Sequence, residues 1–166
     1  MVQYKIRQLT TPEEFAVCAQ MMLSASPWNV LYFTREQCKA DLANDALQVH
    51  AAVAPDGEIF GFMASMAHGI GFEPMIEYLC IGQKHRGLGI GSALIAFFEE
   101  KLFPEADNLY LFVSDINPDA MRLYVRLGYQ QVGALPNFNL EKQTEFLHRK
   151  SRRPRQAARA AAFLTR

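Results

Sequence analysis

The stretch of this chain best suited to chemistry is a glycine-rich run near its middle, which reads QKHRGLGIGS over residues 83–92. A strand-length apolar run, 75–81, precedes it, and apolar residues at helical spacing follow it until Pro104. A glycine-rich turn that opens a helix leaves backbone N–H groups free at the positive end of that helix, where they attract a phosphate or pyrophosphate. We therefore expect a phosphorylated ligand here. A bare tight turn into a helix is the simpler alternative.

Two familiar phosphate-binding patterns do not fit this run. Leu88 stands where a P-loop has its lysine, and Ser92 stands where a dinucleotide-binding turn has its last glycine. The turn must therefore belong to another class of phosphate site.

A second segment, NPDAMRLYVRLGY over residues 117–129, has the form of a capped helix. Asn117 can act as N-cap, Pro118 suits the first helical position, and Gly128 can take the left-handed conformation that ends a helix. Tyr124 falls on the apolar face of this helix. Any capped amphipathic helix looks like this, so Tyr124 could also be an ordinary core tyrosine.

Together the two segments resemble the signatures of the GNAT superfamily of acetyl-CoA-dependent N-acetyltransferases. The first is similar to Arg/Gln-x-x-Gly-x-Gly/Ala through Arg86, Gly89 and Gly91. The second is similar to Asn-x-x-Ala-x-x-x-Tyr-x-x-x-Gly-Phe/Tyr through Asn117 and Tyr124. The two motifs occur in the family's order and at about its spacing, with a strand-like run between them.

The resemblance implies a mixed α/β (α+β) fold: a central, mostly antiparallel sheet of six to seven strands, splayed central strands and about four helices. It implies transfer of an acetyl group from acetyl-CoA to a primary amine, of a small molecule or of a peptide or protein, by direct attack. The alternative from another class is a non-catalytic acyl-CoA-binding or regulatory domain that keeps the cleft. No metal is expected, because no histidine, cysteine or acid cluster has metal-ligand spacing.

The resemblance also assigns roles to residues. Tyr124 resembles the family tyrosine that gives the departing thiolate a proton or hydrogen bond, so it is the expected general acid. Acetyl-CoA binding falls to the glycine turn, to the free edge of the central strand and to the cap of the second helix; these residues are Leu79, Cys80, Ile81, Arg86, Gly87, Leu88, Gly89, Ile90, Gly91, Ser92 and Asn117.

Glu77 is the first candidate for the base that deprotonates the amine. In the central strand, Glu77 is expected to share a face with Met75, Leu79 and Ile81, an unusual place for a carboxylate. Burial there raises a carboxyl pKa and suits it to act as a base, directly or through water. The alternative is a glutamate satisfied by an arginine or a backbone amide, in which case Glu73 in the preceding loop is the second candidate.

Three other reactive side chains are weaker candidates. His68 and His85 can titrate near neutral pH, but a histidine in a loop is more often a bystander. Cys80 is not expected to form an acyl-enzyme, because no partner base is evident and direct attack suffices.

The elements that position these residues follow from local patterns. Thr11 and Thr34 are expected to cap two helices, ending near residues 24 and 44, and Pro55-Asp56-Gly57 predicts a hairpin. A further helix is predicted over 118–127. Strands are predicted at 3–9, 47–54, 58–67, 75–81, 109–113, 129–135 and 144–149. Between the first two helices, Trp28 either contacts the acceptor, as the family suggests for this region, or plugs the core.

Length and composition indicate one globular domain, since the chain has 166 residues, half of them hydrophobic and a fifth charged. Three cysteines without C-x-x-C spacing suggest reduced thiols. The N-terminus lacks the apolar core of a signal peptide, and no run is long enough to span a bilayer, so a cytoplasmic location without a membrane partner is expected.

The zero net charge hides an asymmetry between the body and the C-terminal tail. Residues 151–166 hold five arginines and no acid, which leaves 12 basic against 17 acidic residues in the expected acetyltransferase domain, 1–150. An acidic body suits a cationic acceptor. The basic, Arg/Ala-rich tail is expected to be disordered or an isolated helix, and nucleic acid is not expected as a partner, with RNA or an acidic protein as the alternative. Dimers are frequent in the family, so a homodimer is an expectation of the resemblance.

Overall fold

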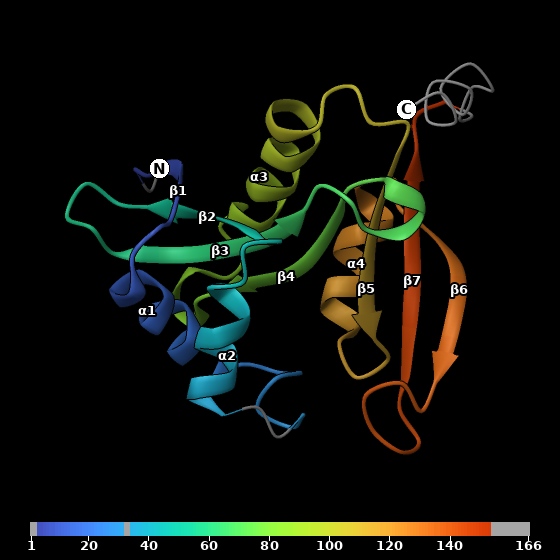
Figure 1. The fold of residues 1–166 in the computed structure, drawn as a ribbon, viewed down its shortest axis with the longest axis horizontal. Coiled ribbons are helices and arrows are strands. Elements are labelled where there is room, and N and C mark those ends of the chain that lie inside the picture. The colour runs from blue at the N-terminus through green and yellow to red at the C-terminus, as the bar shows by residue number, and fades with distance from the viewer. Residues whose placement is uncertain (1–2, 32–33, 154–166) are drawn as a thin grey trace.

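A seven-stranded mixed sheet forms the centre of the molecule, and four α-helices cover its two faces in the described part of the chain (Figure 1). The computed structural model describes residues 3–31 and 34–153. Its strands are β1 (Lys5–Gln8), β2 (Gln48–Val53), β3 (Ile59–Met66), β4 (Met75–Ile81), β5 (Asn108–Ser114), β6 (Gln130–Pro136) and β7 (Thr144–Ser151). Their order is β1-β2-β3-β4-β5-β7-β6, and only β4 and β5 pair in parallel. The predicted fold class, including a mostly antiparallel sheet, is confirmed.

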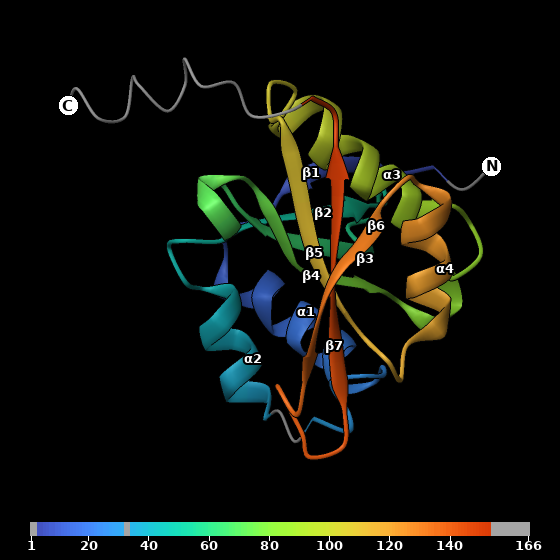
Figure 2. The same cartoon turned by 90° about the vertical axis from the view of Figure 1, so that its right-hand side faces the viewer.

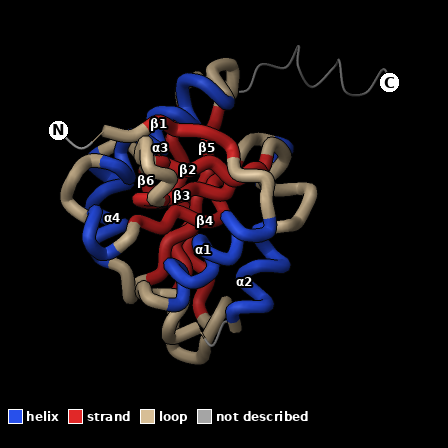
Figure 3. The backbone as a smooth tube through the Cα atoms, turned by 90° about the vertical axis from the view of Figure 1, so that its left-hand side faces the viewer, coloured by secondary structure: helices blue, strands red, loops and turns tan. Residues whose placement is uncertain are grey.

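The helices are α1 (Pro12–Leu23), α2 (Arg35–Leu42), α3 (Ile90–Phe97) and α4 (Pro118–Arg126). A π-helical turn, Phe98–Leu102, continues α3 to the end of the predicted helical pattern. α1 and α2 lie on one face of the sheet, and α3 and α4 lie on the other (Figures 2 and 3). Among the described residues, no helix is long and apolar enough to cross a membrane.

Local sequence signals account for the starts of α1 and α2. The Thr11 hydroxyl accepts from the Glu14 N–H while the Glu14 carboxylate accepts from the Thr11 N–H, and Thr34 and Gln37 form the same reciprocal pair. This arrangement satisfies two N–H groups that a helix start would otherwise leave without partners. The predicted hairpin is also present, with Gly57 at φ 92° in the turn between β2 and β3.

The sheet is nearly divided between β4 and β5. Only two residue pairs join these strands, Met75 with Tyr110 and Ile76 with Leu111, whereas seven pairs join β5 to β7. The two strands start side by side and then diverge, as Figure 1 shows. The splay expected of the central strands is therefore present, and it leaves one edge of β4 without a neighbouring strand beyond Ile76.

A β-bulge lies at the point of divergence. On β3, Ala64 pairs with Tyr78 and the next residue, Ser65, pairs with Ile76, so Glu77 is an extra residue on β4. The expectation that Glu77 shares a face with Leu79 and Ile81 is therefore wrong. The extra residue breaks the alternation, and Ile76 instead joins Leu79 and Ile81 in one hydrophobic cluster.

Two hydrophobic clusters hold the layers together. One packs α1 and α2 on the sheet around Met22, Leu42 and Phe62. The other lies under α3 and α4 and includes Leu94 of α3 and Leu111 of β5. Because this second cluster contains residues from both β4 and β5, side-chain packing joins the two parts of the sheet where backbone pairing stops.

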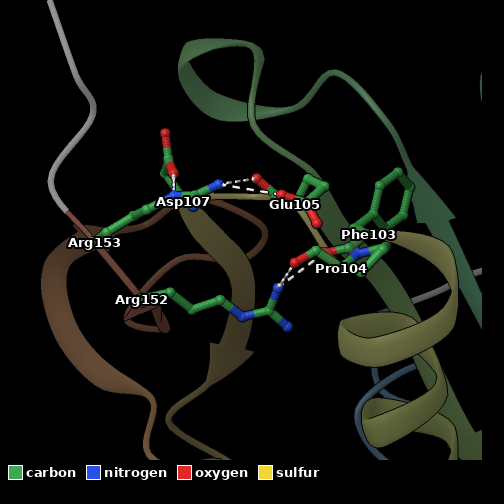
Figure 4. A network of polar contacts seen from close by, with 6 residues as sticks. All are labelled: Phe103, Pro104, Glu105, Asp107, Arg152 and Arg153. Carbon is green, nitrogen blue, oxygen red and sulfur yellow. Dashed lines mark hydrogen bonds and ion pairs between the residues drawn. The ribbon is translucent and has the colours of Figure 1, made fainter.

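The start of the predicted tail is part of the fold. β7 runs to Ser151, and Arg152 donates to the carbonyl oxygens of Glu99, Phe103 and Pro104 at 2.6, 2.9 and 2.9 Å. Arg153 pairs with Asp107 and reaches Glu105 (Figure 4). These contacts tie the end of β7 to the segment that leaves α3. Residues 154–166 of the predicted tail lie outside the described residues.

We expect Arg152→Ala to lower the stability of the protein, because it removes three hydrogen bonds to carbonyl oxygens at the end of the π-helical turn. A loss of ~1–2 kcal/mol is expected, since each such bond to a charged group contributes modestly at a partly exposed site. Thermal unfolding measures this loss, since each kcal/mol lowers the Tm of a domain of this size by about 2–4 °C. Arg149→Ala, an exposed arginine on the same strand, is the control; equal Tm values for the two variants would contradict the assignment.

Candidate active site

The predicted phosphate site is an open turn at the start of α3. Gly87 and Gly89 have φ of 74° and 79°, in the left-handed region that favours glycine. The helical hydrogen bonds begin with the Ala93 N–H, which donates to the Gly89 carbonyl oxygen at 3.0 Å, so the N–H groups just before it lack partners within the helix. A Cβ atom added at Gly87 or Gly89 would meet nothing within 4 Å. The backbone here can therefore contact a ligand directly.

A cavity of about 550 Å³ extends from this turn into the gap between β4 and α4. It brings together most of the predicted cofactor residues: Leu79, Cys80, Ile81, Arg86, Gly87, Gly89, Ile90, Gly91, Ser92 and Asn117. Leu88 is the exception, because it is not part of the lining and its side chain is half exposed. Cationic side chains of Arg86 and Arg126 line the same cavity, which suits a ligand that carries several phosphates.

Asn117 lies where α4 begins. Its side-chain oxygen accepts from the Ala120 N–H at 3.3 Å, as predicted for an N-cap. The oxygen is therefore engaged with the helix, and the amide NH₂ is the group that remains for a ligand.

Tyr124 lies between this cavity and a second one, and its side chain lines both. It is 5% exposed, and its ring packs against those of Tyr129 and His148. Burial raises the pKa of the Tyr124 phenol above its usual value, so the hydroxyl carries its proton at neutral pH. Within the described residues, no hydrogen bond engages this hydroxyl, which leaves it free to donate to a ligand.

The second cavity, of about 250 Å³, lies on the other side of Tyr124, between β4, β5 and the loop before β7. Its walls are aromatic and acidic, with Trp28, Phe112 and Phe138 beside Glu77 and Glu145. Trp28 is buried in the hydrophobic cluster that packs α1 and α2 on the sheet, as expected of a core residue, and it also lines this cavity.

Glu77 faces the second cavity from the bulge in β4. Its side chain is accessible from the cavity rather than buried, which differs from the sequence expectation. The pKa of its carboxyl is nevertheless raised, first by the protein atoms that crowd it and then by the charge of Asp41. The Tyr78 hydroxyl donates to Asp41 at 3.3 Å and fixes that second carboxylate nearby.

The structure adds residues that no sequence pattern indicated. Glu145 of β7 lies in the second cavity although it is 6% exposed, and Asn139 donates to one of its oxygens at 3.0 Å. The place of Glu145 in this cavity is recognised only once β7 is paired with β5, and that pairing joins residues far apart in the chain. A polar residue near the start of a predicted strand carries no such signal.

The weaker candidates lie elsewhere. Glu73 and His68 line neither cavity, while His85 lines the first and contacts Glu58 at 3.3 Å. Burial raises the pKa of the Cys80 thiol to about 12, so it is a neutral, unreactive thiol. Across residues 3–31 and 34–153, no group of histidine, cysteine and acidic residues could hold a metal ion.

Solved structures of several acetyltransferases have the same fold as this chain. Similar structures include the ribosomal-protein-S18-alanine N-acetyltransferase from Escherichia coli, with a TM-score of 0.74, 15% identity and coverage of 93% of this chain and 97% of that one. An aminoglycoside 6'-N-acetyltransferase complexed with coenzyme A has a TM-score of 0.72, 18% identity and coverage of 92% and 99%. NAA60 from Arabidopsis thaliana in complex with acetyl-CoA has a TM-score of 0.71, 20% identity and coverage of 90% and 99%.

The model of the Acetyltransferase (GNAT) family matches residues 5–129, which include both motifs. The chain belongs to this family. Among curated proteins, no sequence matches this one.

We expect Gly89→Ala to weaken coenzyme A binding by about tenfold or more, because a methyl group would project into the space where the backbone meets the ligand. Gly57→Ala is the matched control. Gly57 also has positive φ and open space around it, but it lies in the β2–β3 hairpin. Calorimetric titration with coenzyme A measures the difference; equal affinities in the two variants would contradict a phosphate site at this turn.

Proposed function

We propose that this protein is an N-acetyltransferase that moves an acetyl group from acetyl-CoA to a primary amine by direct attack. The observation that supports this most is the place of Tyr124, at the junction of a cavity that starts at a phosphate-type turn and a second, acidic cavity. In such a transfer, the C–S bond of the thioester breaks where the nucleotide site and the acceptor site meet. The neutral phenol of Tyr124 lies at that point.

The first cavity would hold acetyl-CoA. The N–H groups at the start of α3 would bind the diphosphate, with Arg86 and Arg126 adding charge. Beyond Ile76, the free edge of β4 would pair with the amides of the pantetheine arm, as a peptide adds to a sheet edge. The same edge can supply a main-chain N–H to the carbonyl oxygen of the thioester as negative charge develops on it.

Glu77 would prepare the amine. An alkyl ammonium has a pKa of about 10.4 and must lose a proton before it attacks. The Glu77 carboxylate would accept this proton, directly or through a water, and its raised pKa makes it a stronger base than an ordinary glutamate. The new C–N bond then forms as the C–S bond breaks, and the products are the N-acetylated amine and coenzyme A.

Tyr124 would stabilise the sulfur of coenzyme A as it leaves as a thiolate. Because the pKa of its phenol is raised well above the ~8.5 of a thiol, a hydrogen bond to the thiolate is its first contribution. Tyr124 can then pass a proton to the thiolate, and the second proton that the nitrogen loses as the amide forms balances it. This makes Tyr124 a general acid that acts mainly by stabilising the charged leaving group.

Two assays test the proposal. A thermal-shift measurement with acetyl-CoA reports binding, and thiol release with a panel of primary amines and N-terminal peptides reports turnover. We expect both to be positive. Stabilisation by acetyl-CoA with no thiol release on any acceptor would favour the non-catalytic binding domain instead.

The class of acceptor is narrowed by the second cavity. The similar structures include enzymes named for an aminoglycoside and for the alanine of a ribosomal protein, so the family fold accepts both small molecules and proteins. At about 250 Å³, the acceptor cavity of this chain is below the roughly 300–1,000 Å³ of typical small-molecule sites. We propose that it receives a narrow alkyl amine.

A further inference from the structure

Among the residues that the structure describes, two carboxylates and no basic side chain line the proposed acceptor cavity. Glu77 and Glu145 are the charged residues of its lining, which otherwise consists of aromatic, apolar and neutral polar groups. Across residues 3–31 and 34–153, neither carboxylate forms an ion pair. A cavity with negative charge and no internal counter-charge favours a cationic ligand.

Glu145 is built into its wall more firmly than a surface glutamate would be. Its side chain is more than nine-tenths buried, and Asn139 donates to its Oε1 at 3.0 Å. Ser114 pairs with Glu145 across β5 and β7. Its hydroxyl oxygen accepts from the Gln143 side-chain NH₂ at 2.6 Å, so its O–H is available to donate a hydrogen bond to Glu145. Neutral donors thus orient this carboxylate without neutralising it.

The two carboxylates occupy different surroundings. Burial is the main cause of the raised pKa of both carboxyls, with a smaller contribution from Asp41 at Glu77 and from Asp115 at Glu145. Glu77 lies one residue beyond the Ile76–Leu111 pair on β4, and Glu145 pairs with Ser114, three residues beyond Leu111, on the far side of β5. With strands about 4.8 Å apart and 3.3 Å per residue, their Cα atoms are at least roughly 12 Å apart. The two carboxylates therefore come from the strands on either side of β5.

The surface between the two carboxylates is aromatic. Phe112 of β5 and Phe138 of the loop before β7 stack, with ring centroids 6.0 Å apart and planes 17° from parallel. These rings can cover a short chain of methylene groups. They can also attract a cation through their faces.

We propose that the acceptor is a diamine, whose reacting amine lies at Glu77 and whose second ammonium group binds Glu145 across an alkyl spacer packed on Phe112 and Phe138. This inference rests on the proposed acetyl transfer and names its substrate class. Glu145 is then the specificity residue: it holds the amine that does not react, and it sets the distance between the two nitrogens.

Binding to the coenzyme A-loaded protein tests the inference without turnover. Putrescine, a diamine, is compared by calorimetry with butylamine, a monoamine of the same carbon number. We expect putrescine to bind about 10- to 100-fold more tightly, the range expected for one hydrogen-bonded ion pair. Cadaverine and diaminopropane test the spacing. Equal affinity of putrescine and butylamine for the unmodified protein overturns the proposal.

Glu145→Gln keeps the shape of the side chain and removes its charge. We expect this variant to lose most of the preference for putrescine, through a higher Kd for the diamine. The control is Glu141→Gln, an exposed glutamate in the loop before β7 that lines neither cavity and should keep the preference. A preference that survives Glu145→Gln overturns the assignment of Glu145.

Turnover separates this inference from the proposed function. If diamines and monoamines are acetylated with equal kcat/KM, the protein is an N-acetyltransferase and the diamine proposal is wrong. If no amine is acetylated while putrescine still binds in a Glu145-dependent way, the diamine site stands and the proposed transfer is wrong.

Discussion

Tyr124→Phe should lower kcat by about 10²- to 10⁴-fold, the range of a general acid, while the affinity for acetyl-CoA changes little. The substitution removes a single oxygen, that of the phenol that lines both cavities. The buried ring and its packing against Tyr129 and His148 remain. Steady-state kinetics with a saturating amine and calorimetry with acetyl-CoA separate the two quantities.

Tyr129→Phe is the matched control for this prediction. Tyr129 is fully buried in the same hydrophobic cluster and touches the Tyr124 ring, but it lines neither cavity. Its variant should retain the kcat of the unmodified protein. If Tyr124→Phe behaves like this control, the phenol has no part in the chemistry.

Glu77→Gln should also lower kcat/KM by about 10²- to 10⁴-fold, because glutamine cannot accept the proton of the attacking ammonium. In the unmodified protein, the rise of kcat/KM with pH should begin above the ordinary pKa of a glutamate, since the pKa of Glu77 is raised. The variant should lose that part of the profile. Glu73→Gln is the control, and a loss confined to Glu73→Gln would move the base to the preceding loop.

The same substitution should leave the protein slightly more stable at neutral pH. A carboxyl whose pKa is higher in the folded state binds its proton more tightly there, so stability falls as pH rises from its unfolded pKa to its folded one. Above that window, the ionised Glu77 lowers the stability of the fold, first because protein atoms crowd it and then because Asp41 lies nearby. A higher Tm together with lower activity would show that the loss of rate is not a loss of folding.

Local signals were enough to predict most of the fold. Thr11 and Thr34 cap their helices through the reciprocal bonds that their neighbours indicate, and Gly57 turns the predicted hairpin. The helix after Asn117 begins at Pro118, as the sequence predicts. These features depend on residues within a few positions of one another, so a linear pattern contains them.

The features that the sequence did not reveal depend on longer-range pairing. The bulge at Glu77 has no signature of its own, because a single extra residue is recognisable only against the partner strand. Glu145 enters the acceptor cavity because β7 is inserted between β5 and β6. Arg152 falls in the segment expected to be disordered or an isolated helix, because its three carbonyl partners lie about fifty residues earlier in the chain.

The narrow connection between β4 and β5 has a consequence for the shape of the gap that separates them beyond Ile76. Since two residue pairs alone join these strands, the relative tilt of the two portions of the sheet depends on the hydrophobic cluster that contains Ile76 of β4 and Leu111 of β5. Trimming such a side chain would let the two portions of the sheet tilt toward each other or apart. The position of the β4 edge that we propose to bind the pantetheine arm is thus governed from the interior.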